Sequence, residues 1–253
     1  MNVFITGASS GIGAGLAAEY ASRGAHVGLF ARRAEALAEL VRGLPAGRAS
    51  AYVGDVADAA SVARAAADFT AHAGSPDIVI ANAGISHGID TAAPEDLPVF
   101  AQVLATNVLG IAHTFAPFLP AMRTARRGTL VGIASIAGFR GLPGSGAYSA
   151  SKAAAITYLE SLRVELAGSG VAVVTICPGY IATAMTARNP YRMPFLMDAR
   201  HAARLMAHAI ARRKRWYVLP WQMAIAGWLF RRLPRPLYDR VLANAPRKPR
   251  AVP

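Results

Sequence analysis

Short apolar runs alternate with amphipathic segments along the first 219 residues of the chain. Seven of these runs have the length and the flanking turn residues of buried strands, at residues 3–5, 27–30, 51–54, 78–81, 129–134, 171–177 and 216–219. The segments between them have the spacing of helices. Strands and helices in regular alternation predict a seven-stranded parallel sheet with helical crossovers on both faces. The pattern therefore predicts an α/β fold, and 253 residues suit one such domain with a full core.

A glycine-rich turn follows the first predicted strand and precedes an amphipathic segment that runs to Arg23. Its pattern is Thr6-Gly7, three residues, Gly11, one residue and Gly13. At a helix N-terminus the backbone N–H groups and the helix dipole attract an anion, and glycines let the backbone approach a pyrophosphate closely. A turn without a ligand is the alternative, but the strand before it and the helix after it favour a dinucleotide site. The predicted fold is therefore a single doubly wound Rossmann-type domain.

A second candidate site lies in the middle of the chain, where Tyr148 and Lys152 stand four residues apart. On a helix these side chains share one face, and an ammonium beside a phenol favours the phenolate. We therefore expect Lys152 to lower the pKa of Tyr148 from its ordinary value of about 10, so that the phenol exchanges protons near neutral pH. The pair alone is a weak motif, and the glycine turn gives it weight.

These motifs occur together with others in the order typical of the short-chain dehydrogenase/reductase family, which the chain resembles from its first residues to about residue 219. The other matching positions are Asp55-Val56, Asn82-Ala83-Gly84, Asn107, Ser135, and Pro178-Gly179 followed by Thr183. Ala81 is the one departure, at a structural position where the family has a further Asn.

The resemblance implies a catalytic role for four residues. Tyr148 exchanges a proton with the substrate carbonyl oxygen, and Ser135 donates a hydrogen bond to the same oxygen. Lys152 binds the ribose of the nicotinamide, and Asn107 holds a water that links Lys152 to solvent. Taken alone, Ser135 is typical of a buried serine at a strand end and Asn107 of an asparagine at a helix bend. The cofactor turn and the Tyr148–Lys152 pair favour catalysis.

The cofactor that the sequence predicts is NADP(H). The second predicted strand ends in Ala31, where an NAD site usually has an acidic residue, and Arg32 and Arg33 follow. A guanidinium pairs well with a phosphate, so these arginines favour the 2′-phosphate of NADP; the alternative is that they begin a solvated helix. The predicted cofactor-binding residues are Gly7, Ser9, Ser10, Gly11, Ile12, Gly13, Arg32, Arg33, Asp55, Val56, Asn82, Ala83, Gly84, Tyr148, Lys152, Pro178, Gly179, Ile181 and Thr183.

The segment at residues 183–198 resembles the lid that covers the substrate in this family, and it is rich in methionine and aromatic residues. Such side chains make adaptable apolar contacts, which favours an apolar, lipid-like or steroid-like substrate. Packing of the segment against the C-terminal helix is the alternative. The predicted substrate-binding residues are His87, Phe139, Leu142, Tyr180 and Met185.

Residues 220–253 form a basic and apolar C-terminal extension. From Arg200 to the end there are thirteen basic residues and one acid, Asp239, within a net charge of +13. Residues 216–230 are too short for a membrane span of about 20 residues and are interrupted by Pro220 and Gln222, whereas residues 221–233 predict a helix. One side of this predicted helix carries Trp221, Ile225, Trp228 and Leu229. The extension is interpreted as a membrane-surface helix, a cover for the active site or a partner subunit, or, least favoured, a nucleic-acid contact.

Other features restrict compartment, metal content and assembly. Cys177 is the single cysteine, which excludes an internal disulfide, and the spacing of the histidines predicts no metal site. Because the first predicted strand begins almost at Met1, removal of a signal peptide would destroy the cofactor turn, so a cytosolic location, with membrane-peripheral contact as an option, is expected. By resemblance, the helix that holds Asn107 and the helix after Tyr148 build a dimer or tetramer interface.

The sequence thus predicts an NADP(H)-dependent oxidoreductase that transfers hydride between nicotinamide and a carbonyl or secondary alcohol of an apolar substrate. A ketoacyl reductase of fatty-acid-type metabolism shares all of these catalytic residues and is the first alternative. A binding protein that keeps the fold without catalysis is the second, and the complete catalytic set argues against it.

Overall fold

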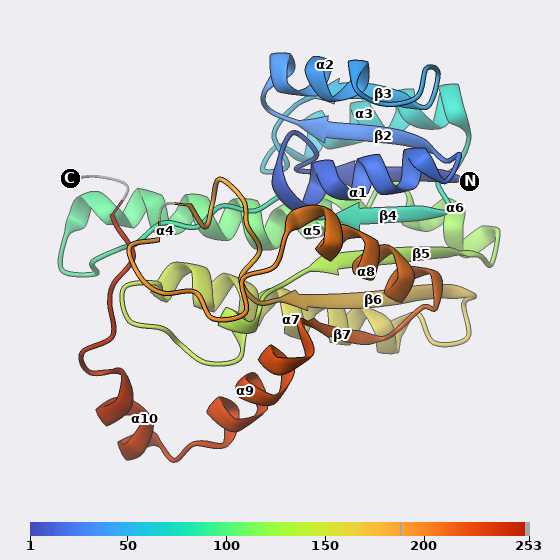
Figure 1. Cartoon of the computed structure of the whole chain (residues 1–253). Coiled ribbons are helices and arrows are strands. Elements are labelled where there is room, and N and C mark those ends of the chain that lie inside the picture. The colour runs from blue at the N-terminus through green and yellow to red at the C-terminus, as the bar shows by residue number, and fades with distance from the viewer. Residues whose placement is uncertain (188, 251–253) are drawn as a thin grey trace.

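The computed structural model describes residues 1–187 and 189–250, and within this part of the chain seven strands form one sheet. The strand order is β3-β2-β1-β4-β5-β6-β7, and each neighbouring pair is parallel (Figure 1). The strands are β1 (Asn2–Thr6), β2 (His26–Ala31), β3 (Ala49–Val53), β4 (Ile78–Ala81), β5 (Gly128–Ile133), β6 (Val171–Pro178) and β7 (Trp216–Leu219). Each lies within two residues of its predicted position, and the doubly wound α/β fold is confirmed.

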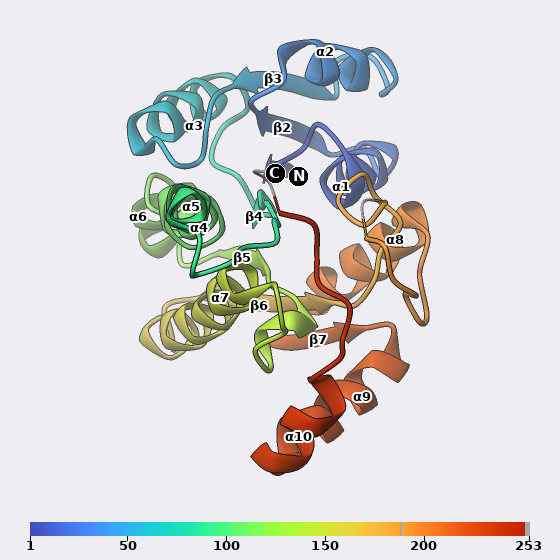
Figure 2. The same ribbon diagram turned by 90° about the vertical axis from the view of Figure 1, so that its left-hand side faces the viewer.

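Helices cover both faces of the sheet (Figure 2). Each connection between parallel strands must bring the chain back to the end of the sheet where the strands begin, and a helix usually forms this crossover. One face carries α1 (Gly11–Ser22), α2 (Ala34–Arg42) and α8 (Ala199–Ala211). The other carries α3 (Ala59–Ala73), α4 (Leu97–Leu104), α5 (Gly110–Phe115), α6 (Leu119–Thr124) and α7 (Gly146–Glu165). Three short turns of helix are η1 (Pro94–Asp96), the π-helical η2 (Ala105–Leu109) and η3 (Ile136–Gly138).

The strands have an apolar core on each side, since successive side chains of a strand point to opposite faces. In β1, Val3 and Ile5 pack toward α1 and α8, whereas Phe4 packs toward α3. The rings of Phe4 and Phe69 meet edge to face with centroids 5.4 Å apart. Burial on both faces explains why the strand sequences are nearly continuous apolar runs.

The sheet order reverses between β1 and β4, and this reversal positions the candidate site. From β1 the chain proceeds outward through β2 and β3, and from β4 it proceeds in the opposite direction through β5, β6 and β7. In sheets of this kind the loops at the carboxyl ends diverge at the reversal and leave a crevice for a ligand. The glycine turn leaves β1 at this point.

The C-terminal extension begins with two helices, α9 (Trp221–Arg232) and α10 (Arg235–Leu242). The predicted helix at residues 221–233 is therefore confirmed. Its inner side buries Met223 and Gly227, and a Cβ on Gly227 would lie 2.6 Å from the Phe139 ring. Its outer side exposes the four predicted apolar residues, Trp221, Ile225, Trp228 and Leu229. Contact of this outer side with a membrane or a partner subunit stays a prediction, as does the cytosolic location.

Within the described residues, the segment Pro94–Phe115 is long and apolar enough to cross a membrane by length and composition. It consists of η1, α4, η2 and α5, contains Asn107, and packs against α7 and α3. We therefore assign this segment to the helical layer of the α/β domain. It is also the helix that the resemblance places in an oligomer interface, which stays a prediction.

Candidate active site

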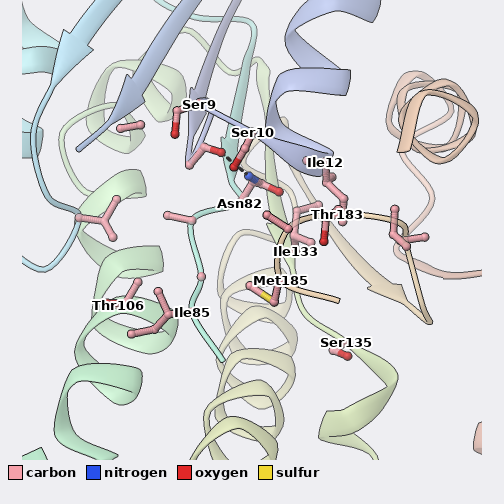
Figure 3. Close-up of a pocket in the computed structure, with 18 of the residues that line it drawn as sticks. Ser9, Ser10, Ile12, Asn82, Ile85, Thr106, Ile133, Ser135, Thr183 and Met185 are labelled. Carbon is pink, nitrogen blue, oxygen red and sulfur yellow. Dashed lines mark hydrogen bonds between the residues drawn. The ribbon is translucent and has the colours of Figure 1, made fainter. Parts of the chain in front are cut away.

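The glycine turn is held rigidly between the end of β1 and the start of α1. Gly7 and Gly11 have φ angles of 65° and 55°, in the left-handed region that favours glycine. Asn82 follows β4 (Figure 3), and its Nδ2 donates to the carbonyl oxygens of Thr6 and Gly7 at 3.0 and 3.2 Å. The Thr6 hydroxyl accepts from the Asn82 backbone N–H at 3.2 Å. The first-turn N–H groups of α1 are thereby fixed as donors for an anion.

The turn forms one wall of a cavity of about 310 Å³ at the carboxyl edge of the sheet. All predicted cofactor-binding residues line this cavity except Gly13, which lies directly beneath Gly7. Sequence reasoning missed further lining residues, namely Phe30, Ala31, Gly54, Ile85, Thr106, Ile133, Ala134, Ala184 and Thr186. Each of these stands within one or two positions of a predicted residue, so adjacency along the chain is the signal that could have found them.

Arg32 and Arg33 line the cavity beside the glycine turn. The Arg33 Nη2 donates to the Ser9 Oγ at 3.1 Å, and the Arg32 Nη1 lies 3.6 Å from the Asp55 Oδ2. Both guanidiniums are exposed to solvent, whereas Ala31 is buried at the end of β2. Two exposed guanidiniums therefore lie next to the glycine turn.

Three of the four predicted catalytic residues line the same cavity. Tyr148 and Lys152 lie one turn apart near the start of α7, and the Lys152 Nζ is 5.8 Å from the centroid of the Tyr148 ring. Lys152 donates to the Ile133 carbonyl oxygen at 2.8 Å. Ser135 follows β5 (Figure 3), and its Oγ accepts from the Ala137 N–H at 3.1 Å. The ends of β5 and α7 thus bring a phenol, a hydroxyl and an ammonium together.

The expectation that Lys152 lowers the pKa of Tyr148 is wrong. Burial raises the pKa of Tyr148 above its ordinary value, and a hydrogen bond with the Ser135 side chain opposes this rise only in part. Burial also lowers the pKa of Lys152 to about 8. In both groups desolvation penalises the charged form and is the largest cause of the pKa shift. Tyr148 is therefore protonated at neutral pH, which is the form that can donate a proton.

Asn107 is buried behind the cavity, in the π-helical turn η2. Its Oδ1 accepts from the Ile85 N–H at 2.8 Å, and its Nδ2 donates to the Ile85 carbonyl oxygen and to the Ser151 Oγ, both at 2.9 Å. The side-chain amide of Asn107 therefore makes both hydrogen bonds to the Ile85 backbone, as the backbone of a neighbouring strand would do. A Cβ on Gly84 would lie 3.3 Å from the Asn107 Oδ1 and 3.5 Å from the Lys152 Nζ. The geometry gives Asn107 a positioning role for this loop, and its contact with water stays a prediction.

The five predicted substrate-binding residues lie in different surroundings. Met185 lines the cavity, and the Tyr180 ring lies 6.4 Å from the Tyr191 ring in the lid segment. Leu142 is partly exposed in the loop before α7, and His87 lies in the loop after β4. The Phe139 ring stacks on Trp216 with centroids 5.6 Å apart and packs against Gly227 of α9, and its contact with substrate stays a prediction.

Comparison with known proteins identifies the class to which this site belongs. The family model for short chain dehydrogenases matches residues 1–192, and the chain therefore belongs to the short-chain dehydrogenase/reductase family. It is 41% identical over 237 residues to an uncharacterized oxidoreductase of Myxococcus xanthus (strain DK1622), with 93% of both chains covered. It is 34% identical to dehydrogenase/reductase SDR family member 7B of Bos taurus, over 98% of this chain and 82% of that protein.

A solved structure supports the same assignment. The closed form of serine dehydrogenase complexed with NADP+ matches with a TM-score of 0.77 and 25% identity, over 83% of this chain and 88% of that one. The protein is thus an oxidoreductase of this family, which acts on CH–OH groups with a nicotinamide cofactor and a small-molecule substrate.

Proposed function

We propose that this protein is an NADP(H)-dependent carbonyl reductase that reduces apolar ketones or, in reverse, oxidises the corresponding secondary alcohols. The observation that carries the proposal is the meeting of Tyr148, Ser135 and Lys152 in the cavity that also contains the glycine turn. A phenol that is protonated at neutral pH suits the direction of reduction.

The residues of the cavity fit a dinucleotide. The N–H groups at the start of α1 suit a pyrophosphate, because the positive φ of Gly7 and Gly11 turns the backbone toward the crevice. Arg33, held at Ser9, suits a 2′-phosphate. By family resemblance, Pro178, Gly179 and Thr183 hold the nicotinamide, which supplies the hydride when it is bound.

The protein's own part in the reaction is proton transfer and charge stabilisation. Tyr148 gives its phenolic proton to the carbonyl oxygen as negative charge develops there, and Ser135 donates a hydrogen bond to the same oxygen. By family resemblance, Lys152 binds the ribose of the nicotinamide, and its Nζ lies 5.8 Å from the centroid of the Tyr148 ring. Asn107 maintains the loop at Gly84 and Ile85 against which Lys152 lies.

The proposed activity is tested by NADPH oxidation, followed by absorbance, with purified protein and a panel of ketones. We expect long-chain and polycyclic ketones to be reduced with higher kcat/KM than small polar ketoses, because Met185, Ile85 and Ile181 give the cavity apolar walls. Activity confined to small polar sugars would contradict the apolar substrate class. NADPH that neither binds nor is oxidised would contradict the whole proposal.

Cofactor selectivity is tested by Arg33→Ala. Loss of a charge-assisted hydrogen bond to a phosphate costs about 1.5–3 kcal/mol, so the Kd of NADPH should rise about tenfold to a hundredfold. The Kd of NADH, which lacks the 2′-phosphate, should change by less than about threefold. Fluorescence titration of both reduced cofactors measures these values.

Arg42→Ala is the matched control for this test. Arg42 is exposed at the end of α2, and its loss also lowers the net charge by one without touching the glycine turn. It should leave both Kd values as they are. Equal losses of NADPH and NADH affinity in Arg33→Ala would show that Arg33 stabilises the glycine turn and does not bind the 2′-phosphate of NADPH.

A further inference from the structure

The last described residues, 245–250, form an extended segment that we call the C-terminal strap. It leaves α10 and crosses the carboxyl edge of the sheet, in front of the strand ends in Figure 2. Its far end pairs with the loop after β4: the Gly88 N–H donates to the Pro249 carbonyl oxygen at 2.9 Å, and Gly88 and Arg250 form a parallel bridge.

Arg250 anchors this end of the strap by two ion pairs. Its Nε donates to the Asp96 Oδ2 at 2.7 Å, and its Nη2 donates to the Glu95 Oε1 at 2.8 Å. The Asp96 side chain is buried, and the hydrogen bonds from Arg250 and from the Asp90 N–H hold its pKa below the ordinary value. A buried carboxylate that stays charged needs a cationic partner, and Arg250 is that partner for Asp96. Loss of the strap would leave this charge unpaired.

The near end of the strap is fixed to the loop before α7. The Tyr238 hydroxyl of α10 donates to the Gly141 carbonyl oxygen, and the Arg140 guanidinium lies 4.0 Å from the centroid of the Tyr238 ring. The strap then passes so close to Gly144 that a Cβ there would lie 2.8 Å from the Arg247 Cβ. The loop before α7 and the loop after β4 are themselves joined, since the Ile89 N–H donates to the Gly144 carbonyl oxygen at 3.2 Å. The strap therefore crosses beside the start of α7, where Tyr148 lies.

Lys248 is the strap residue that points toward the reaction site. Its Nζ lies 5.9 Å from the centroid of the Tyr148 ring and donates to the Ser86 Oγ at 2.8 Å. It is half-buried, whereas its neighbours Arg247 and Pro249 are exposed. The Tyr148 ring is thus approached by two ammonium groups at almost equal distance, Lys152 from its own helix and Lys248 from the strap.

We propose that Lys248 determines substrate specificity by binding an anionic group, most simply a carboxylate, carried by the carbonyl substrate. The proposal rests on the proposed reductase function, because a carbonyl oxygen bound at Tyr148 brings the rest of the substrate against the strap. A partly desolvated ammonium attracts an anion more strongly than an exposed one does. The substrate class is therefore an apolar ketone that bears an acid group close to the carbonyl.

The alternative role for Lys248 is purely structural, as an anchor of the strap at Ser86. The two roles differ in what they do to substrates of different charge. An anchor affects acids and neutral esters alike, whereas a binding residue affects the acid alone. The test therefore uses acetoacetate, levulinate and para-acetylbenzoate, each paired with its methyl ester, and compares kcat/KM for acid and ester.

For the wild-type protein we expect the acid of at least one pair to exceed its ester in kcat/KM. Lys248→Met keeps the apolar stem and removes the charge, and it should lower the ratio of acid to ester by at least about tenfold, mainly through KM, as expected for loss of a hydrogen bond to a charged group. Lys214→Met removes an exposed lysine after α8 and should leave the ratio unchanged. An unchanged ratio in Lys248→Met would overturn the proposal, and so would activation of acid and ester alike, which would identify the strap as an obstacle.

A second measurement decides the question if none of the pairs is turned over. The melting temperature of the NADP+-bound protein is recorded with levulinate and with methyl levulinate. Stabilisation by levulinate alone, lost in Lys248→Met, supports the anion site, and equal shifts overturn it. NADPH titration of the same samples reports separately on the proposed cofactor site, so failure of that function is distinguishable from failure of this inference.

Discussion

Tyr148→Phe should lower kcat by about a thousandfold, because general acid catalysis by a positioned side chain contributes about 10²–10⁴ to the rate. The phenol is protonated at neutral pH and is hydrogen-bonded with Ser135, and in the proposed mechanism it is the proton donor for the carbonyl oxygen. Phenylalanine keeps the ring and removes only the hydroxyl. The Kd of NADPH should therefore stay within about twofold of the wild-type value. A twofold change corresponds to about 0.4 kcal/mol, and we expect the loss of the hydroxyl to change the binding free energy by no more than this. Steady-state kinetics and fluorescence titration measure the two effects.

Tyr158→Phe is the control for this prediction. Tyr158 lies on the same helix α7, ten positions after Tyr148, and is partly buried against the core on the α7 side of the sheet. Loss of its hydroxyl changes the helix composition in the same way and should leave kcat as it is. If Tyr148→Phe retained a tenth or more of the wild-type kcat, a different group would have to supply the proton, and the assigned chemistry would be wrong.

Gly13→Ala should lower the free energy of unfolding by about 3 kcal/mol, the upper part of the range for added volume in a close-packed site. A Cβ on Gly13 would lie 2.3 Å from the Gly7 carbonyl oxygen and 2.6 Å from the Asn82 Nδ2. Neither atom can withdraw easily, because Asn82 is hydrogen-bonded to that same oxygen and to Thr6. The glycine turn must therefore open, and NADPH affinity should fall by more than tenfold with it. Urea denaturation and fluorescence titration measure the two effects.

Gly43→Ala is the matched substitution at a permissive position. Gly43 follows α2 with a φ of −82°, and the nearest atom to a Cβ there, the Leu40 carbonyl oxygen, lies at an ordinary 3.5 Å. Stability should be unchanged or slightly higher, because alanine restricts the unfolded chain. NADPH affinity at the wild-type level in Gly13→Ala would show that the turn is not the cofactor site, even if the protein were destabilised.

The C-terminal extension consists of two parts with different surroundings, the strap and helix α9. Residues 245–250 lie over the active-site side of the domain, as the interpretation of a cover expects, whereas α9 turns its predicted apolar side to solvent. A basic composition alone does not distinguish these parts, because arginine serves in one as an ion-pair partner of Asp96 and in the other as an exposed charge beside Trp228.

The sequence by itself determined the features that depend on neighbours along the chain. The seven strands follow from apolar runs, and the glycine turn and the Tyr148–Lys152 pair follow from short spacings that local backbone geometry converts into shared positions. The outward side of α9 follows in the same way from helical periodicity.

Only the tertiary structure decided the properties that depend on residues distant along the chain. The pKa of Tyr148 rises because the folded domain removes the phenol from water, and the hydrogen bond with Ser135 opposes this rise only in part. Phe139 packs on Trp216 because the fold places β7 and α9 beside it. Lys248 lies close to the Tyr148 ring, a hundred positions away in the sequence, because the ion pair between Arg250 and Asp96 holds the strap in place. Desolvation and long-range packing are set by the whole fold, and local spacing contains no measure of either.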